Sequence, residues 1–190
     1  MTNLPLLRRL FDIGEIVRRA GFPPTETTLD AIIYLLQEVF HMDLGCRFQL
    51  YGSSPWSDDL RNHLGALQSY GYIAYHAAPG DREAHFVPGP FVASLLHHSE
   101  PLSWEARNQL AAVLPHLAQL PRLSCSTVAT AVYYLHKGNA AGAFNARMGR
   151  ILGLSREDVD LALRRAQCLV DAGRQYDGYW LDSGMASTTH

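Results

Sequence analysis

Residues 49–73, QLYGSSPWSDDLRNHLGALQSYGYI, join a short apolar run to a helix-like segment through a Gly-Ser-Ser-Pro corner. Apolar and polar residues alternate over residues 46–51, which predicts a short strand. The helix is predicted to begin at Ser57 or Asp58, because acidic residues favour a first turn, and to end at Gly71. A strand, a corner and a helix in this order can hold a nucleophile, bind a phosphate or only turn the chain.

The corner lacks the residues that catalysis or phosphate binding would require. A nucleophile elbow needs a glycine on both sides of its serine, and Ser53-Ser54 has one on the first side only. A phosphate-binding loop needs more glycines and a Lys-Ser or Lys-Thr pair at the helix start. We therefore expect a structural corner, in which Pro55 fixes the backbone, Ser57 caps the helix and Trp56 packs on the core.

The elements on either side of this stretch predict a winged-helix-like unit. Apolar residues recur every three or four positions in two earlier segments, which predicts an N-terminal helix and a second helix capped by Thr27 or Thr28. After the stretch, residues 72–75 and 84–87 flank a Pro-Gly-Asp turn, which predicts a β-hairpin. Two helices, a strand, a third helix and a hairpin are typical of a winged helix, with the hairpin as its wing.

The second half of the chain is predicted to be helical throughout. Proline and glycine divide it into helices over about 91–98, 103–120, 125–137, 143–152 and 155–173. We expect a mainly α fold, with a winged-helix-like unit at 1–90 and a helical unit at 91–181 that packs against it and shares its core or has its own. Residues 182–190 are expected to form a frayed tail. The similar segments 28–36 and 127–135 leave an internal repeat open.

The composition is that of a folded chain with little overall charge. The 190 residues are 47% hydrophobic and 18% charged, which is sufficient for a hydrophobic core. A net charge of −2 at pH 7 gives no general attraction to nucleic acid or to an anionic membrane. The sequence contains no run near the roughly 20 apolar residues of a membrane span, and no signal-peptide pattern at its start. We expect a soluble, cytoplasmic protein.

Cysteine and histidine residues do not form a catalytic or metal-binding pattern. Cys46, Cys125 and Cys168 are widely spaced and odd in number, which predicts reduced thiols. The neighbours His97 and His98 point in different directions on a predicted helix and do not suit one metal ion. Cys125 begins a predicted helix, whose dipole would lower the pKa of the thiol, but no base partner can be assigned. We therefore predict no catalytic residue, no metal site, no cofactor and no enzymatic activity.

Two arginine pairs on the first predicted helix suggest one mode of binding. Arg8-Arg9 and Arg18-Arg19 are ten residues apart, close to three helical turns, and can form a stripe that contacts a phosphate backbone. The helix in the recognition position opens instead with two aspartates, which are unfavourable near phosphates. A winged-helix DNA-binding transcriptional regulator is therefore the alternative function, with these four arginines as its candidate contacts.

An aromatic run near the C-terminus suggests another mode of binding. Tyr176, Tyr179 and Trp180 follow the last predicted helix, where burial of all three is hard to arrange, and Tyr and Trp are preferred anchors of protein interfaces. We predict that these residues form an edge that binds another protein. A homo-oligomer is compatible with this prediction, and the sequence does not identify the partner.

Residues 27–73 resemble the YwgA-like group and the related Panacea-type proteins, which are small bacterial families. The resemblance rests on Asp30-Ala-Ile-Ile-Tyr-Leu-Leu-Gln37, Phe48-Gln-Leu-Tyr-Gly52, Ser-Pro-Trp-Ser57 and the closing residues 67–73. This chain differs by inserting Ser53-Ser54 before the corner proline, and by Ala31 and Ile32 where basic residues are common. The resemblance implies a winged-helix-like fold without established enzymatic activity, and an antitoxin or regulatory role as proposed for some relatives. We therefore expect a non-enzymatic regulatory or adaptor protein.

Overall fold

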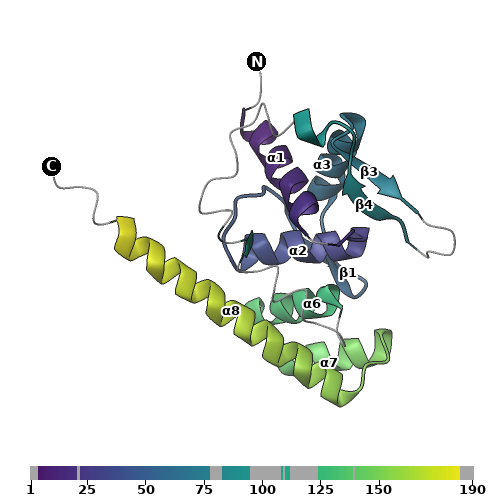
Figure 1. Cartoon of the computed structure of the whole chain (residues 1–190). Helices are drawn as coiled ribbons and strands as arrows, with labels where there is room; N and C mark the ends of the chain where they lie inside the picture. The colour runs from purple at the N-terminus through teal and green to yellow at the C-terminus, as the bar shows by residue number, and fades with distance from the viewer. Residues whose placement is uncertain are drawn as a thin grey trace.

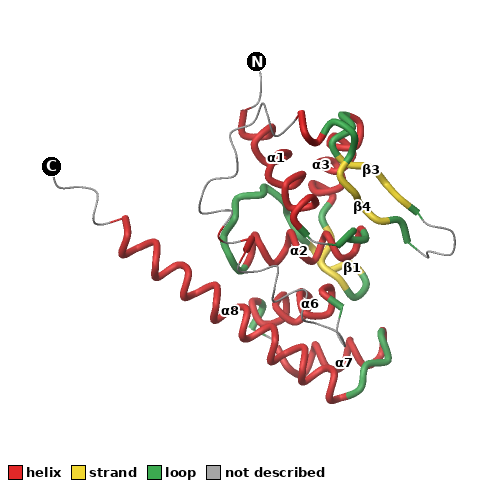
Figure 2. The backbone as a smooth tube through the Cα atoms, in the orientation of Figure 1, coloured by secondary structure: helices red, strands yellow, loops and turns green. Residues whose placement is uncertain are grey.

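The fold of the chain is mainly helical with two small antiparallel sheets (Figures 1 and 2). The computed structural model describes residues 4–20, 22–77, 83–94, 108, 110–111, 124–138 and 140–184, with side chains from residue 8 onward except at 140, 141 and 175–184. Within this part of the chain, no helix is long and apolar enough to cross a membrane.

The first two helices supply much of the core. Helix α1 (Leu4–Arg19) buries one face, which includes Ile13 and Ile16, against α3 (Asp58–Ser69) and β4 (His85–Pro88). Helix α2 (Glu26–Glu38) is buried from Leu29 to Leu36, because apolar residues lie on all sides of this stretch and such a helix is stable only inside the protein. Its N-cap is Thr25, whose hydroxyl accepts a hydrogen bond from the Thr28 N–H, so the prediction of Thr27 or Thr28 was wrong.

The Gly-Ser-Ser-Pro corner closes a hairpin between two short strands. Strand β1 (Gln49–Tyr51) pairs antiparallel with β2 (Ser54–Trp56), which leaves Gly52 and Ser53 as the two-residue turn. Gly52 has a φ of +58° and Ser53 does not have a positive φ, the pattern of a type II′ turn, which suits the twist of paired strands. The predicted strand at 46–51 is therefore shorter than expected, and the corner joins two strands before the helix begins.

Helix α3 (Asp58–Ser69) begins where the sequence predicted. The Ser57 hydroxyl accepts a hydrogen bond from the Leu60 N–H at 3.2 Å, which confirms Ser57 as the N-cap. The prediction for Trp56 was wrong. Its ring is only half-buried, and the Arg61 guanidinium carbon lies 4.3 Å from the ring centroid. The indole N–H donates to Asp58, which holds the ring at the surface.

The predicted hairpin is confirmed. Strands β3 (Ile73–His76) and β4 (His85–Pro88) pair antiparallel, with Tyr75 opposite Phe86. The predicted Pro-Gly-Asp turn lies outside the described residues. Phe86 is 1% exposed, and its N–H donates to the carbonyl of Pro24, so this hairpin is fixed to the chain just before α2.

The C-terminal half contains helices α6 (Cys125–His136), α7 (Ala140–Ile151) and α8 (Arg156–Gly184). The first two agree with prediction to within a few residues. The predicted end of the last helix at residue 173 was wrong, because α8 continues to Gly184 and includes part of the expected frayed tail. The predicted helices at 91–98 and 103–120 lie mostly outside the described residues.

Buried residues from both halves of the chain form one hydrophobic cluster. Helix α2 lies between the N-terminal elements and α6, and α6 in turn packs against α7 and α8 (Figure 1). Strand β2 contacts both α2 and α6, so the hairpin of the Gly-Ser-Ser-Pro corner sits where the two halves meet.

Two side chains of the C-terminal half bind the turn of this hairpin. The Thr130 hydroxyl of α6 shares its one hydrogen between the Ser53 carbonyl at 2.7 Å and the Ser126 carbonyl of its own helix at 2.8 Å. Arg147 of α7 donates to the Gly52 carbonyl through Nε at 3.1 Å and Nη2 at 2.7 Å. The corner therefore has a structural role, since its two carbonyl oxygens connect the N-terminal half to α6 and α7.

Removing the Thr130 hydroxyl is expected to weaken this connection. Thr130→Val keeps the shape of a fully buried side chain but leaves the Ser53 carbonyl without its donor, which should lower the free energy of unfolding by about 1–2 kcal/mol. Arg147→Met should lower it by about 1 kcal/mol. Urea unfolding measures both. Ser69→Ala is the control, because the Ser69 hydroxyl donates only to a carbonyl within an exposed helix end. A loss of stability for Ser69→Ala as large as that for Thr130→Val would contradict the role of the turn.

Candidate functional site

The predicted reactive thiol does not have the properties of a nucleophile. Cys125 is the first residue of α6, after the N-cap Ser124, as expected. Burial raises the pKa of its thiol to about 12, so desolvation outweighs the helix dipole that was expected to lower it. Cys125 therefore remains a neutral thiol at physiological pH. The other candidates for catalysis, His97 and His98, lie outside the described residues.

The fold brings a second cysteine close to a histidine. Cys46 Sγ lies 3.8 Å from His63 Nδ1, and both residues are buried. The side-chain amide of Gln37 accepts from the Cys46 N–H at 2.9 Å and donates to its carbonyl at 2.6 Å, which fixes the loop that carries the thiol. Sequence reasoning missed this pair, because its members are 17 positions apart and no spacing rule connects a loop to a helix.

Burial determines the chemistry of this pair. It raises the pKa of the Cys46 thiol to about 12, with a smaller contribution from the nearby Asp59 carboxylate. Burial also lowers the pKa of His63, against the attraction of Asp59. The thiol and the imidazole are therefore both neutral near pH 7, which is the opposite of the thiolate and imidazolium of a cysteine nucleophile.

An open hollow of about 630 Å³ is lined in part by Cys46. Its lining includes Arg9, Gln37, His41, Met42, Asp43, Gly45, Cys46, Arg47 and Asp59. Arg9 pairs with Asp43 at 3.0 Å, and Arg47 pairs with Asp59 through its side chain and its backbone N–H. Each arginine in the lining is thus matched by an aspartate, so the hollow has little net charge with which to attract an ionic ligand.

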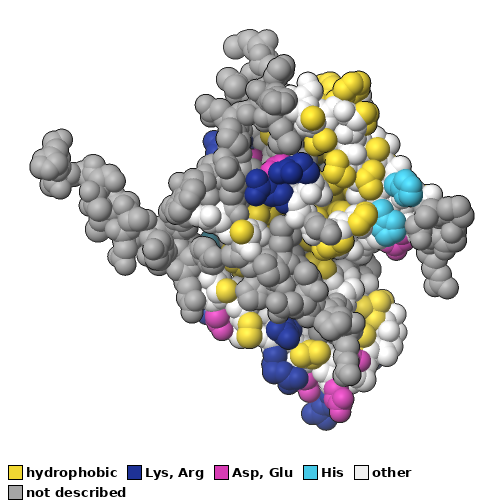
Figure 3. Space-filling view, viewed as in Figure 1, with side chains coloured by type: hydrophobic (Ala, Val, Ile, Leu, Met, Phe, Trp, Pro, Cys, Tyr) yellow, Lys and Arg dark blue, Asp and Glu magenta, His cyan; other side chains and the backbone are white. Residues whose placement is uncertain are grey.

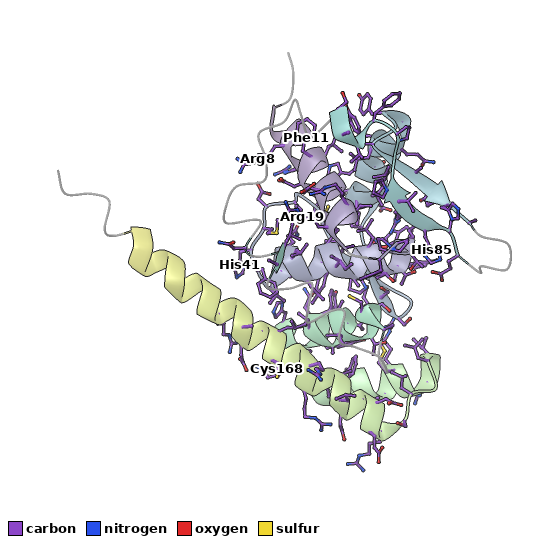
Figure 4. All side chains as sticks on the ribbon, viewed as in Figure 1. Arg8, Phe11, Arg19, His41, His85 and Cys168 are labelled. Carbon is purple, nitrogen blue, oxygen red and sulfur yellow. The ribbon has the colours of Figure 1, made fainter. Side chains whose placement is uncertain are left out.

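The arginine stripe of α1 is largely engaged by carboxylates of the same protein. Arg18 and Arg19 both bind Glu15, at 2.6 and 2.5 Å. Burial alone would raise the pKa of Glu15, but the hydrogen bonds from these two arginines hold it below its usual value. Figure 3 shows arginine side chains lying beside carboxylates on this face, and Figure 4 labels Arg8 and Arg19 on α1.

Arg8 and Arg9 are the other half of the predicted stripe. Arg9 makes the ion pair with Asp43, and its side chain is 33% exposed. Arg8 is exposed and acts on Asp12, one helical turn further along. Burial raises the pKa of Asp12 to about 6, although Arg8 opposes this shift. A phosphate that approached α1 would compete with these carboxylates, which reduces the charge available for DNA.

The predicted protein-binding residues lie in α8, not beyond the last helix. The helical backbone includes Tyr176, Tyr179 and Trp180, whose side chains are outside the described part. Their spacing of three and four residues places them along one side of the helix. A signal for this arrangement was present in the spacing, but Gly173 was interpreted as a helix end.

Comparisons with known proteins leave the family open. No protein-family model matches the chain, and no curated protein is similar to it in sequence. The resemblance to the YwgA-like and Panacea-type proteins therefore stays a prediction.

The described residues do not assemble a site for metal-dependent chemistry. Among them, no three His, Cys, Asp or Glu side chains are grouped closely enough to hold a metal ion. The cysteine–histidine pair is neutral, and the hollow beside Cys46 is lined by paired charges.

Proposed function

We propose that this protein is a non-enzymatic regulatory or adaptor protein that binds another protein through the C-terminal part of α8. The main support is the length of α8, which continues as a helix past Gly173 to Gly184. Figure 1 shows its last turns extending away from the other labelled elements. A helix that leaves the fold in this way is stabilised when a partner packs along it, because isolated helical turns are marginal in water.

The register of α8 supports the position of this binding surface. Its buried face consists of Val159, Ala162, Ala166, Leu169, Val170 and Gly173. Positions 176 and 180 are three and seven residues after Gly173, so they continue this row, and position 179 flanks it. The apolar row that packs inside the fold therefore extends into the aromatic positions, which is the pattern of a helix that docks against an apolar partner surface.

The N-terminal elements support a regulatory role. The order α1, α2, β1–β2, α3 and β3–β4 is compatible with a winged-helix-like unit, in which the β3–β4 hairpin would be the wing. An antitoxin-like role is what the resemblance to the YwgA-like group implies. DNA binding receives less support, because three of the four arginines of α1 form ion pairs with carboxylates and α3 opens with Asp58 and Asp59.

Removing the aromatic anchors is expected to abolish partner binding. The variant Tyr176→Ala/Tyr179→Ala/Trp180→Ala should bind its partner at least about 30-fold more weakly, because interface anchors of these types contribute about 2 kcal/mol or more. A pull-down from the native host, with nuclease treatment and mass spectrometry, identifies the partner, and titration of that partner measures the loss. Truncation after Gly173 should have the same effect, and truncation after Gly184 should not.

The matched control removes three exposed aromatic side chains elsewhere. Tyr51, Tyr70 and Phe91 are 72%, 59% and 59% exposed, and their replacement by alanine should leave partner binding intact. Equal binding by the α8 variant and the wild type would contradict the proposal. So would tight binding of duplex DNA at physiological salt that is lost when Arg8, Arg9, Arg18 and Arg19 become alanine, since phosphate contacts weaken steeply with salt and an apolar interface does not.

A further inference from the structure

A buried cluster at the junction of α2 and α3 contains one arginine between two carboxylates. The guanidinium of Arg61 on α3 binds Glu26 through Nη1 and Asp30 through Nη2, and both carboxylates belong to α2. Asp30 is 1% exposed. Two negative groups thus share one positive group, so the fully ionised cluster has a net charge of −1, and Asp30 is closed to water although the Glu26 side chain is partly exposed.

The hydrogen bonding of this cluster is incomplete. Asp30 Oδ1 and Arg61 Nε are both buried and have no hydrogen-bond partner among the described residues. An ionised carboxylate normally accepts hydrogen bonds at both oxygens, and a buried carboxylate with one oxygen unpaired is unfavourable. A proton on this carboxyl would remove the uncompensated charge and leave Arg61 with Glu26 as its ionised partner.

The groups around Asp30 act in opposite directions. Burial is the largest influence and raises the pKa of its carboxyl to about 7, and the negative charge of Glu26 adds to this effect. Arg61 and the backbone N–H of Ser57, the N-cap of α3, oppose it. Two further titratable groups face the cluster: the Cys46 thiol from the loop after α2, and Tyr75 of β3 beside Glu26 and Arg61.

We propose that Asp30 is a reversible proton-binding site, because its buried carboxylate shares one arginine with Glu26 and leaves Oδ1 without a partner, and that it couples the α2–α3 junction to the β1–β2 hairpin. The coupling runs through Arg61, whose guanidinium carbon lies 4.3 Å from the centroid of the Trp56 ring. Trp56 is paired with Gln49 in the hairpin whose turn binds Thr130 and Arg147. The charge state of Asp30 therefore alters the interactions of the arginine that lies over this hairpin.

The sign of the pH dependence follows from the direction of the shift. The carboxyl binds its proton more tightly in the folded chain than in the unfolded chain, where its pKa is about 4. Protonation thus favours the folded state, and this contribution is complete below pH 4 and is lost as the pH rises through 7. Between pH 4 and pH 8, the unfolding equilibrium constant of the wild type should rise up to about a thousandfold relative to Asp30→Asn.

Carbon-13 NMR of the full-length, uniformly labelled chain measures the proton directly. The side-chain carboxyl resonance of Asp30 should titrate with a midpoint near 7, and the indole N–H resonance of Trp56 should shift with the same midpoint. Glu26→Gln removes the second carboxylate from the cluster, and the variant should fold because the Glu26 side chain is partly exposed. The titration midpoint of Asp30 should be lower in this variant than in the wild type. Glu38→Gln, at the other end of α2, is the control and should leave the midpoint unchanged.

Two outcomes would overturn the proposal. One is an Asp30 midpoint at or below about 4 in the wild type, which is the value of a solvated or fully paired carboxylate. The other is an Asp30 midpoint near 7 that does not change in Glu26→Gln. This result would show that the negative charge of Glu26 does not raise the pKa of Asp30. Both are read from the wild type and the Glu26 and Glu38 variants, so the test does not depend on whether Asp30→Asn folds.

Discussion

Replacing Gly173 with alanine is expected to lower the free energy of unfolding by about 1–3 kcal/mol, the usual range for an overpacked core. Alanine ordinarily favours a helix over glycine, and Gly173 lies inside α8. At this position, however, a Cβ atom would lie 2.3 Å from the Val39 carbonyl oxygen and 2.8 Å from Val39 Cγ1. The oxygen belongs to the backbone and cannot rotate away, so α8 must move from the end of α2.

The same substitution at Gly149 provides the control. Gly149 lies within α7, and a Cβ atom there would meet nothing within 4 Å. Gly149→Ala should therefore raise the free energy of unfolding by up to about 1 kcal/mol through helix propensity alone. Urea unfolding of the two variants should give changes of opposite sign. Stabilisation by Gly173→Ala would show that α8 does not approach α2 as closely as described.

Replacing Arg61 with methionine is expected to lower the free energy of unfolding by about 1–2 kcal/mol at pH 8, because Asp30, whose pKa is about 7, loses its partner and must take up a proton at a cost of about 1.4 kcal/mol per pH unit. Methionine retains much of the apolar stem over Trp56, so loss of charge dominates the change. The effect should be much smaller at pH 5, where the raised pKa of Asp30 keeps that carboxyl protonated and neutral. Denaturant unfolding at both pH values measures the difference.

Arg47→Met is the matched control for this prediction. Arg47 also pairs with an aspartate, Asp59, but its side chain is 91% exposed. Water screens exposed ion pairs, so the loss should be small and nearly equal at pH 5 and pH 8. A large loss for Arg61→Met that does not depend on pH would mean that the guanidinium acts through packing and not through the charge of Asp30.

Elements with strong local signals were predicted correctly. Ser57 before two aspartates identified the start of α3, because a side-chain cap and the helix dipole act within a few residues of the chain. The β3–β4 hairpin was predicted from two short alternating runs around a turn. Both are decided by neighbours in sequence, and the structure places them within one or two residues of the prediction.

Elements that depend on distant contacts were predicted incorrectly. Three threonines near the start of α2 could each cap this helix, and in the structure the cap is Thr25. Strand β4 holds the chain at this point through the hydrogen bond from Phe86 to Pro24 and the Thr25–His85 bridge. Gly173 was interpreted as a helix end because glycine often follows one. In the structure this glycine allows α8 to pass close to Val39, and the helix continues.

The sequence by itself determined the mainly helical class, the second hairpin, the cap of α3 and the helices α6 and α7, because periodicity, capping and turn residues act locally. The tertiary structure alone decided that the Gly-Ser-Ser-Pro turn binds α6 and α7, that Cys46 meets His63 and that Asp30 and Glu26 share Arg61. These contacts join residues between 17 and 95 positions apart. The stabilities of these contacts depend on burial and on interactions between charges away from water. Both conditions require segments that are distant in sequence to pack together and exclude water.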